Sequence, residues 1–300
     1  MKVTVLVATY NGERYLCEQL DSILDQEGVE VSVVVRDDGS KDGTVNILKR
    51  YKEKYSNFSY YTGPNVRSAR CFFDLLSNAG EADYYAFSDQ DDVWDKDKLL
   101  IATNMLSSYD QSKPQLYMSN LRVVDQDLNF LRNSHSTPKD ETNLYSVLTE
   151  HLAVGCTMVF NKVLLKMCAS NLPKGEIMHD TWFEFVARFF GEVYYDFTPH
   201  ISYRQHGNNV IGTSTNKYTA WKNRIKRVMT RQEPRYHHAK VFLDTFDSVP
   251  STFDWEKLNK VVKYKESLGK WLSLLLDKEI RTSSWKTEIR YRFLILFRMI

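Results

Sequence analysis

The chain has 300 residues, of which 43% are hydrophobic and 26% are charged, an ordinary balance for a globular protein with a substantial core. The net charge of +2 is unevenly spread, because residues 201–300 carry 20 Lys and Arg against 9 Asp and Glu. This asymmetry indicates an acidic catalytic part and a basic part that faces an anionic partner. Nucleic acid is not the expected partner, since no recognition motif accompanies the charge. No stretch reaches the ~18 apolar residues of a membrane span.

The cysteine pattern and the first residues point to the cytoplasm. Four cysteines are scattered without a CxxC pair: Cys17, Cys71, Cys156 and Cys168. Reduced thiols are therefore expected, and a zinc site is not. Met1-Lys2 leads directly into an apolar strand pattern without the features of a secretory signal.

Strand and helix patterns alternate along the first hundred residues. Buried strands are predicted over residues 2–10, 30–36, 57–62 and 82–88, with amphipathic helices between them. This alternation predicts a doubly wound α/β sheet with right-handed crossovers. Further strands are predicted over residues 114–118 and 121–124, across a turn at Ser119-Asn120, and over residues 153–160.

Polar residues follow each of the four predicted parallel strands. They are Tyr10-Asn11, Asp37-Asp38, Asn65 and Asp89-Gln90-Asp91. Loops after parallel strands gather at the carboxyl edge of a sheet, where ligands bind. Taken alone, Asp-Asp-Gly-Ser is more often a turn than a site, but four polar clusters at four consecutive strand ends favour a site.

The acidic cluster Asp89, Asp91 and Asp92 is the strongest single signal. Three carboxylates within four residues repel one another unless a cation, a basic neighbour or solvent compensates them. A hard divalent ion carrying a diphosphate suits such a strand end, although acids also favour a helix N-terminus. The sequence contains neither GxGxxG after the first strand nor a P-loop, so a metal, Mg²⁺ or Mn²⁺, is expected to hold the diphosphate.

Two polar segments in the second half are further candidates. His179-Asp180 opens an amphipathic helix, where Asp180 is either an N-cap or a general base. Arg204 and His206 precede Gly207 and two asparagines in a pattern typical of a loop closing over a diphosphate. There His206 would ligand the metal or contact a phosphate oxygen, and Arg204 would neutralise charge on the leaving group.

The last residues carry two apolar helical patterns. Leu258, Val261, Val262, Leu268, Leu272 and Leu275 fit one face, and Trp285, Ile289, Phe293, Leu296, Phe297 and Ile300 fit another. Basic residues flank the second face, which favours peripheral contact with a membrane. The alternative is packing on the main domain or on a second subunit in a homo-oligomer.

Several stretches resemble one enzyme family in the expected order. ATYNGERYL, VVRDDGSKDGT, GPNVRSARCFF and FSDQDDVWDKDKL resemble the nucleotide-sugar half of the inverting family 2 glycosyltransferases. AVGCTMVFNKVLL, MHDTWFEFVARFFG and YRQHGNNVIG resemble their bacterial rhamnosyltransferase-like branch. The resemblance covers residues 3–212 and implies a GT-A fold, with a Rossmann-like mixed sheet flanked by helices. We expect this domain over residues 1–215 and a basic helical region over residues 216–300.

The resemblance also implies roles for individual residues. Thr9 and Tyr10, with Asn11, would line the uridine or thymidine pocket, and Asp38 or Asp37 would accept the base N3–H. The residues near the nucleotide and its sugar would be Asn65, Arg67, Arg70, Asp89, Gln90 and Arg204. Where the family often has Asn-x-Gly, this chain has Asn65-Val66-Arg67. Asp91 would ligand the metal, and Asp180 would be the catalytic base.

The expected activity is sugar transfer from a nucleotide diphosphate to a hydroxyl of a lipid-linked bacterial surface polysaccharide intermediate. The resemblance suggests dTDP-rhamnose first, and a UDP-hexose or UDP-N-acetylhexosamine second. The work would take place at the inner face of the plasma membrane. One rival is a nucleotidyltransferase, which usually has a glycine-rich basic loop that ATYNGERYL lacks. The other is a non-catalytic subunit that binds nucleotide sugars.

Overall fold

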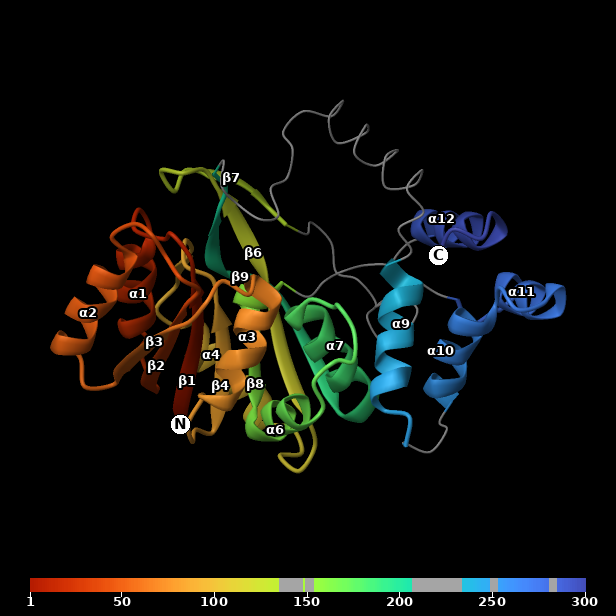
Figure 1. The fold of residues 1–300 in the computed structure, drawn as a ribbon, viewed down its shortest axis with the longest axis horizontal. Helices are drawn as coiled ribbons and strands as arrows, with labels where there is room; N and C mark the ends of the chain where they lie inside the picture. The colour runs from red at the N-terminus through yellow and green to blue at the C-terminus, as the bar shows by residue number, and fades with distance from the viewer. Residues whose placement is uncertain (135–147, 149–153, 207–233, 249–252, 281–284) are drawn as a thin grey trace. The chain divides into compact units, whose positions relative to one another are not determined.

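The computed structural model describes residues 1–134, 148, 154–206, 234–248, 253–280 and 285–300 (Figure 1). The chain divides into two compact units. Unit 1 comprises Met1–Thr137, Ala153–Leu172 and Met178–His206, and unit 2 comprises Pro138–Leu152, Pro173–Ile177 and Gly207–Ile300. The predicted domain boundary at residues 215 and 216 lies outside the described residues.

The first half of unit 1 is a parallel sheet. Its strands are β1 (Lys2–Thr9), β2 (Glu30–Asp37), β3 (Phe58–Thr62) and β4 (Tyr84–Ser88), in the spatial order β3-β2-β1-β4. All neighbours in this half pair in parallel, so their carboxyl ends lie at one edge. Val3, Val5 and Leu6 are fully buried, which fits the near-continuous apolar run expected for a strand covered on both faces.

The second half of the sheet is mixed. It continues β4-β8-β6-β9-β5, with β7 (Phe130–Asn133) paired to β6. The strands are β5 (Val93–Trp94), β6 (Gln115–Val124), β8 (Val159–Asn161) and β9 (Glu192–Arg204). β8 runs antiparallel to both neighbours, whereas β6 and β9 are parallel. The sheet therefore contains both directions, as expected for the GT-A fold.

One turn and part of one strand predicted in this half differ from the structure. β6 is one strand without the predicted turn at Ser119-Asn120, because those two residues lie where its pairing with β9 shifts register. A bulge of this kind accommodates polar residues without ending a strand. The predicted strand over residues 153–160 is correct only at its end, since Gly155–Thr157 form the 3₁₀ turn η1 before β8.

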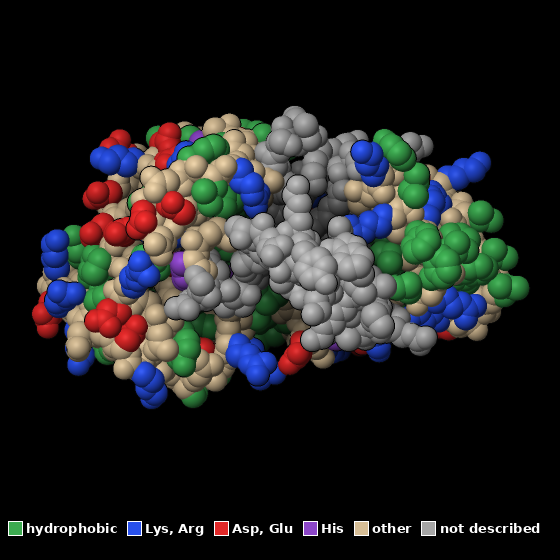
Figure 2. Space-filling view, turned by 90° about the horizontal axis from the view of Figure 1, so that it is seen from above, with side chains coloured by type: hydrophobic (Ala, Val, Ile, Leu, Met, Phe, Trp, Pro, Cys, Tyr) green, Lys and Arg blue, Asp and Glu red, His purple; other side chains and the backbone are tan. Residues whose placement is uncertain are grey.

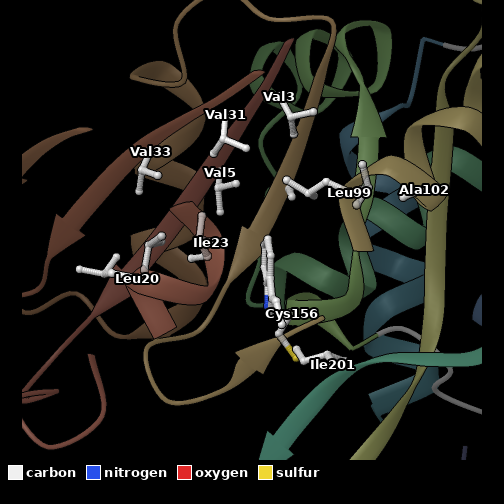
Figure 3. Packing of buried hydrophobic residues seen from close by; sticks show 14 of the residues in the cluster. Val3, Val5, Leu20, Ile23, Val31, Val33, Leu99, Ala102, Cys156 and Ile201 are labelled. Atoms are coloured by element: carbon white, nitrogen blue, oxygen red, sulfur yellow. The ribbon is translucent and has the colours of Figure 1, made fainter. Parts of the chain in front are cut away.

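Helices cover both faces of the sheet (Figure 1). One face carries α3 (Ser68–Ser77), α6 (Lys162–Ser170) and α7 (His179–Phe190). The other carries α1 (Leu16–Leu24), α2 (Thr44–Lys54) and α4 (Lys98–Ser107). On this second face Leu20, Ile23 and Leu99 pack with valines of β1 and β2 in a buried core (Figure 3). The core fixes the strand ends from which the site is built.

Unit 2 contains α9 (Pro234–Thr245), α10 (Phe253–Lys263), α11 (Leu268–Leu275) and α12 (Trp285–Leu296). The single face predicted from Leu258 to Leu275 is wrong, because the chain breaks between α10 and α11. Ser267 caps α11 by accepting a hydrogen bond from the Lys270 N–H at 3.2 Å, and a serine N-cap marks a helix start. In the part of the chain that is described, no helix has the length and apolar character needed to cross a bilayer.

Candidate active site

Gln90 links the loops that follow β1 and β4. Its Oε1 accepts hydrogen bonds from Thr9 Oγ1 at 2.7 Å and the Tyr10 N–H at 2.8 Å. Its Nε2 donates to the Tyr10 carbonyl at 3.2 Å. Thr9 is buried and Tyr10 is exposed, so the Tyr10 ring is free to meet a ligand while its backbone is fixed.

The loop after β1 is also joined to the loop after β2. The Asn11 N–H donates to Ser40 Oγ, and the Lys41 N–H donates to Asn11 Oδ1, both at 2.8 Å. The Asp38 N–H donates to the Thr9 carbonyl at 2.8 Å. The strand ends singled out in the sequence are thus held together by direct hydrogen bonds.

Asp37 and Asp38 are both buried, but they hold different segments. Asp37 Oδ2 accepts from the Gly39 and Ser40 N–H groups at 3.2 and 3.1 Å, while Oδ1 finds no hydrogen-bond donor among the described residues. Asp38 pairs with the buried guanidinium of Arg36 and accepts from the N–H groups of residues 66 and 67 at 3.0 Å. Asp38 therefore fixes the start of α3, and Asp37 closes its own turn.

Asn65 and Arg67 lie between β3 and the first turn of α3, and Arg70 lies in that turn. Asn65, Arg67 and Arg70 are all exposed. Arg67 has φ of 69°, the left-handed region in which glycine is favoured. The chain thus adopts this backbone shape with an arginine. Its side chain is left at the edge of the site.

Asp91 and His206 meet across the site, although 115 residues separate them in the sequence. His206 Nε2 lies 2.7 Å from Asp91 Oδ2, and the imidazole packs on Tyr15 at a centroid distance of 4.9 Å. Arg204 is buried behind this pair. Its Nε donates to the Asp91 carbonyl at 2.9 Å, its Nη2 pairs with Glu18, and its guanidinium lies over the Tyr15 ring. Arg204 thereby holds the backbone that carries the Asp91–His206 pair.

Asp92 points into the protein. It is fully buried, and its Oδ1 accepts from the Arg204 N–H at 3.1 Å. Burial and the nearby charges of Asp91 and Asp89 raise the pKa of Asp92 well above its usual value. Asp92 ties the end of β9 to the acidic loop.

The side chains present fit a divalent cation. Asp91 and His206 offer a carboxylate oxygen and an imidazole nitrogen in direct contact, and Asp89, Asp92 and Cys156 place ligand atoms within 4.8 Å of one another. Carboxylates suit Mg²⁺ and Mn²⁺, and an imidazole favours first-row transition ions. The mixed oxygen and nitrogen set therefore fits Mn²⁺ at least as well as Mg²⁺.

The charge of Asp180 acts on the acidic loop, by which we mean residues Asp89–Asp92. Burial, then the charges of Asp91 and Asp180, raise the pKa of Asp89 to about 7. Asp180 is half-buried in the first turn of α7. Its Oδ1 accepts from the Thr181 N–H at 2.6 Å, and Oδ2 accepts no hydrogen bond from the described residues. One carboxylate oxygen of Asp180 therefore remains available for another partner.

His179 anchors the residue next to it. Its ring is stacked on Phe72 at 3.9 Å and lies edge-on to Phe87 at 5.0 Å. Burial lowers the pKa of His179 to about 4, so the imidazole is neutral at pH 7. Gly155 leaves room for the ring, because a Cβ there would lie 2.5 Å from His179 Nε2.

Sequence reasoning missed several residues that build this site. They are Tyr15, Glu18, Cys156 and Gly155 as a spacer for His179. None belongs to a polar strand end or an acidic run. The neighbour of Gly155 is an imidazole, which no local pattern around the glycine indicates.

Comparisons with known proteins agree with this geometry. The sequence model of glycosyl transferase family 2 matches residues 4–167. The dTDP-rhamnosyl transferase RfbG of Shigella flexneri is 31% identical over 221 residues, which are 69% of this chain and 74% of RfbG.

Solved structures share the fold at low identity. Residues 1–349 of S. aureus TarS in complex with UDP-GlcNAc match with a TM-score of 0.61 and 18% identity, over 100% of this chain and 83% of that fragment. The mannosyltransferase PcManGT from Pyrobaculum calidifontis, in complex with GDP-Man and Mn²⁺, matches with a TM-score of 0.52 and 17% identity. That match covers 99% of this chain and 80% of PcManGT.

The likeness to these structures confirms the predicted GT-A architecture. A family match over more than half the chain, with polar strand ends joined at one edge, identifies the kind of enzyme. The chain belongs to glycosyl transferase family 2, in its bacterial rhamnosyltransferase-like branch, and acts on nucleotide sugars.

Proposed function

We propose that this enzyme transfers L-rhamnose from dTDP-rhamnose to a hydroxyl of a lipid-linked bacterial surface polysaccharide intermediate, with inversion at the anomeric carbon. The 31% identity with a dTDP-rhamnosyl transferase supports this donor over a UDP-hexose or UDP-N-acetylhexosamine. The catalytic domain comprises residues 1–215, and residues 216–300 contact the cytoplasmic face of the plasma membrane. The basic excess of residues 201–300 and the four free cysteines support this location.

The observation that carries the proposal is the position of Asp180. Its carboxylate interacts with Asp89 at the sheet edge, and its Oδ2 is not used by the described residues. A base for an inverting transfer must reach the acceptor hydroxyl on the face of the sugar opposite the leaving group. A carboxylate in the first turn of α7, whose charge acts on Asp89, supports this role for Asp180.

Asp180 removes the acceptor proton while the hydroxyl oxygen attacks the anomeric carbon and the bond to the nucleotide diphosphate breaks. Asp89 contacts the ribose or the sugar. Asp91 and His206 would hold Mg²⁺ or Mn²⁺, which supplies positive charge to the departing diphosphate when bound. Arg204, through its hydrogen bonds, keeps Asp91 in place.

The nucleotide is held by the loops after β1, β2 and β3. Thr9, Tyr10 and Asn11 form one side of the base pocket, which Gln90 braces. Asp37 or Asp38 accepts the base N3–H. The exposed residues Asn65, Arg67 and Arg70 bind the nucleotide, and their two guanidinium groups suit phosphate oxygens.

The test is an Asp180→Asn variant assayed with dTDP-rhamnose and acceptor lipids extracted from bacterial membranes. The amide keeps the shape of the side chain but cannot accept a proton at neutral pH. Removing a general base costs about 10²–10⁴-fold in rate. We expect transfer to fall by that factor while calorimetry shows unchanged affinity for dTDP.

Asp25→Asn is the matched control, because Asp25 is exposed at the end of α1. Its transfer rate should equal that of the wild type. Full transfer by Asp180→Asn would remove Asp180 from catalysis. If the wild type bound the donor but transferred no sugar, a non-catalytic subunit would be favoured. Transfer from UDP-sugars but not dTDP-rhamnose would correct the donor alone.

A further inference from the structure

Helix α12 in unit 2 has two apolar sides, of which one is buried and the other is exposed among the described residues. Tyr291 and Ile295 are buried. On the other side the exposed fractions are 68% for Trp285, 57% for Ile289 and 55% for Phe293. These three recur every four residues, which places them on one helical face. Phe297 continues the series at 56% exposure, with its ring 4.5 Å from that of Phe293.

Helix α11 carries a matching row. Leu268, Leu272 and Leu276 also recur every four residues and are exposed, whereas Leu274 is buried. The two helices are fixed to each other by side-chain hydrogen bonds. Trp271 Nε1 donates to the Ile295 carbonyl at 2.9 Å, and Arg292 Nη1 donates to the Leu275 carbonyl at 2.6 Å. These exposed rows, with Leu296, form what we call the C-terminal apolar face.

Figure 2 shows hydrophobic side chains gathered in this part of unit 2, with Lys and Arg side chains at their edge. An ordinary protein surface exposes large apolar side chains singly, whereas these two neighbouring helices and the residues that follow them expose eight. A face of this kind marks a surface that meets an apolar partner. The charge around it decides which partner.

The bordering charge is basic. Lys286, Arg290 and Arg298 are exposed on or next to α12, whose only acid is Glu288. Residues 201–300 carry an excess of 11 positive charges, from 20 basic and 9 acidic residues. A second copy would bring the same positive excess and be repelled, whereas anionic lipid would attract it. Apolar side chains between basic ones are the pattern of an interfacial helix.

We propose that the C-terminal apolar face inserts among the headgroups of an anionic membrane, with its aromatic and leucine side chains in contact with the acyl chains. The proposal rests on the proposed function, whose membrane contact it assigns to these side chains. Bound in this way, the enzyme meets a lipid-linked acceptor in the plane of the membrane.

The test is sedimentation of the full chain with vesicles of phosphatidylcholine alone or mixed with phosphatidylglycerol. We expect binding to the mixed vesicles that weakens as salt is raised, and little binding to the neutral ones. Phe293→Gln combined with Phe297→Gln should weaken binding at least tenfold. Lys286→Gln should weaken it about fivefold, since one basic residue near anionic lipid contributes about 1 kcal/mol.

Phe130→Gln combined with Leu131→Gln is the matched control, because these exposed residues of β7 lie in unit 1. It should bind vesicles like the wild type. Equal binding to both kinds of vesicle, or full binding by the phenylalanine pair, would overturn the proposal. So would a wild type that ignores vesicles and self-associates through this face in light scattering.

Binding of dTDP in solution distinguishes this failure from failure of the proposed function. The phenylalanine pair should keep the affinity of the wild type for dTDP. Circular dichroism of both double variants shows whether their helices are intact. Vesicle binding lost with dTDP binding retained therefore concerns the C-terminal apolar face alone.

Discussion

Gly155 is the position at which one methyl group should disturb both the core and the proposed catalytic base. A Cβ there would lie 2.5 Å from His179 Nε2 and 3.2 Å from Cε1. The imidazole has no room to move, because Phe72 is stacked on it and Phe87 lies at its edge. The strain of Gly155→Ala must therefore pass to the first turn of α7, which carries Asp180.

The expected magnitude follows from overpacking. An added methyl group in a tight core costs about 1–3 kcal/mol. At about 2 kcal/mol, a domain of this size loses roughly 4–8 °C in Tm. A shift of about 1 Å in a catalytic group can cost about 100-fold in rate. We therefore expect Gly155→Ala to lower Tm by several degrees and to slow transfer by more than tenfold, while dTDP binding changes little.

A double-mutant cycle measured by thermal melting isolates the contact. His179→Ala removes the ring and costs stability itself, but it frees the space that the new methyl group needs. Gly155→Ala should therefore cost much less in the His179→Ala background than in the wild type. Gly269→Ala is the control, because nothing lies within 4 Å of a Cβ there. Additive effects, or equal effects of the two glycine substitutions, would refute the reasoning.

Three further predictions concern stability and ligand affinity. Burial lowers the pKa of His179 to about 4, so the folded state binds fewer protons than the unfolded state below pH 6.5. The free energy of unfolding should therefore decrease as the pH is lowered. His179 should account for about 2 kcal/mol of the decrease in the free energy of unfolding between pH 7.5 and 5. Urea denaturation of His179→Phe should show a pH dependence without this part. Asp38→Asn should cost about 3 kcal/mol in the same assay, because buried Arg36 loses a charged partner; a loss below 1 kcal/mol would contradict this. Arg204→Met should weaken Mn²⁺ binding about 10–100-fold by calorimetry, because Asp91 loses its support, and unchanged affinity would show that Arg204 is not needed there.

The parallel half of the fold could be predicted because its signals are local. Each strand is a short apolar run, and each ends in a polar turn that the sequence displays directly. Ser119-Asn120 misled the prediction because the same two polar residues suit a turn or a bulge. Pairing with β9, more than 70 residues away, selects the bulge. The break before α11 was overlooked although Ser267 is an ordinary N-cap.

The candidate site divides in the same way. The acidic loop and the polar strand ends were found because like charges and turn residues stand out in a sequence. The partners that orient them were not, because Tyr15 and Glu18 reach Arg204 only through the fold. The sequence also did not decide whether Asp180 is a helix N-cap or a general base. The assigned roles stay predictions, and the structure adds which atoms are available for them.

A thermal-shift panel tests the central claim most directly. The folded chain would be heated with UDP, dTDP, GDP, CDP or ADP, with and without Mn²⁺, alongside Asp91→Asn. Binding to the folded state alone raises stability, by about 2.7 kcal/mol at 100 times Kd. The account predicts a rise in Tm with dTDP or UDP that requires Mn²⁺ and is lost in Asp91→Asn. No rise with any nucleotide in folded protein would contradict it.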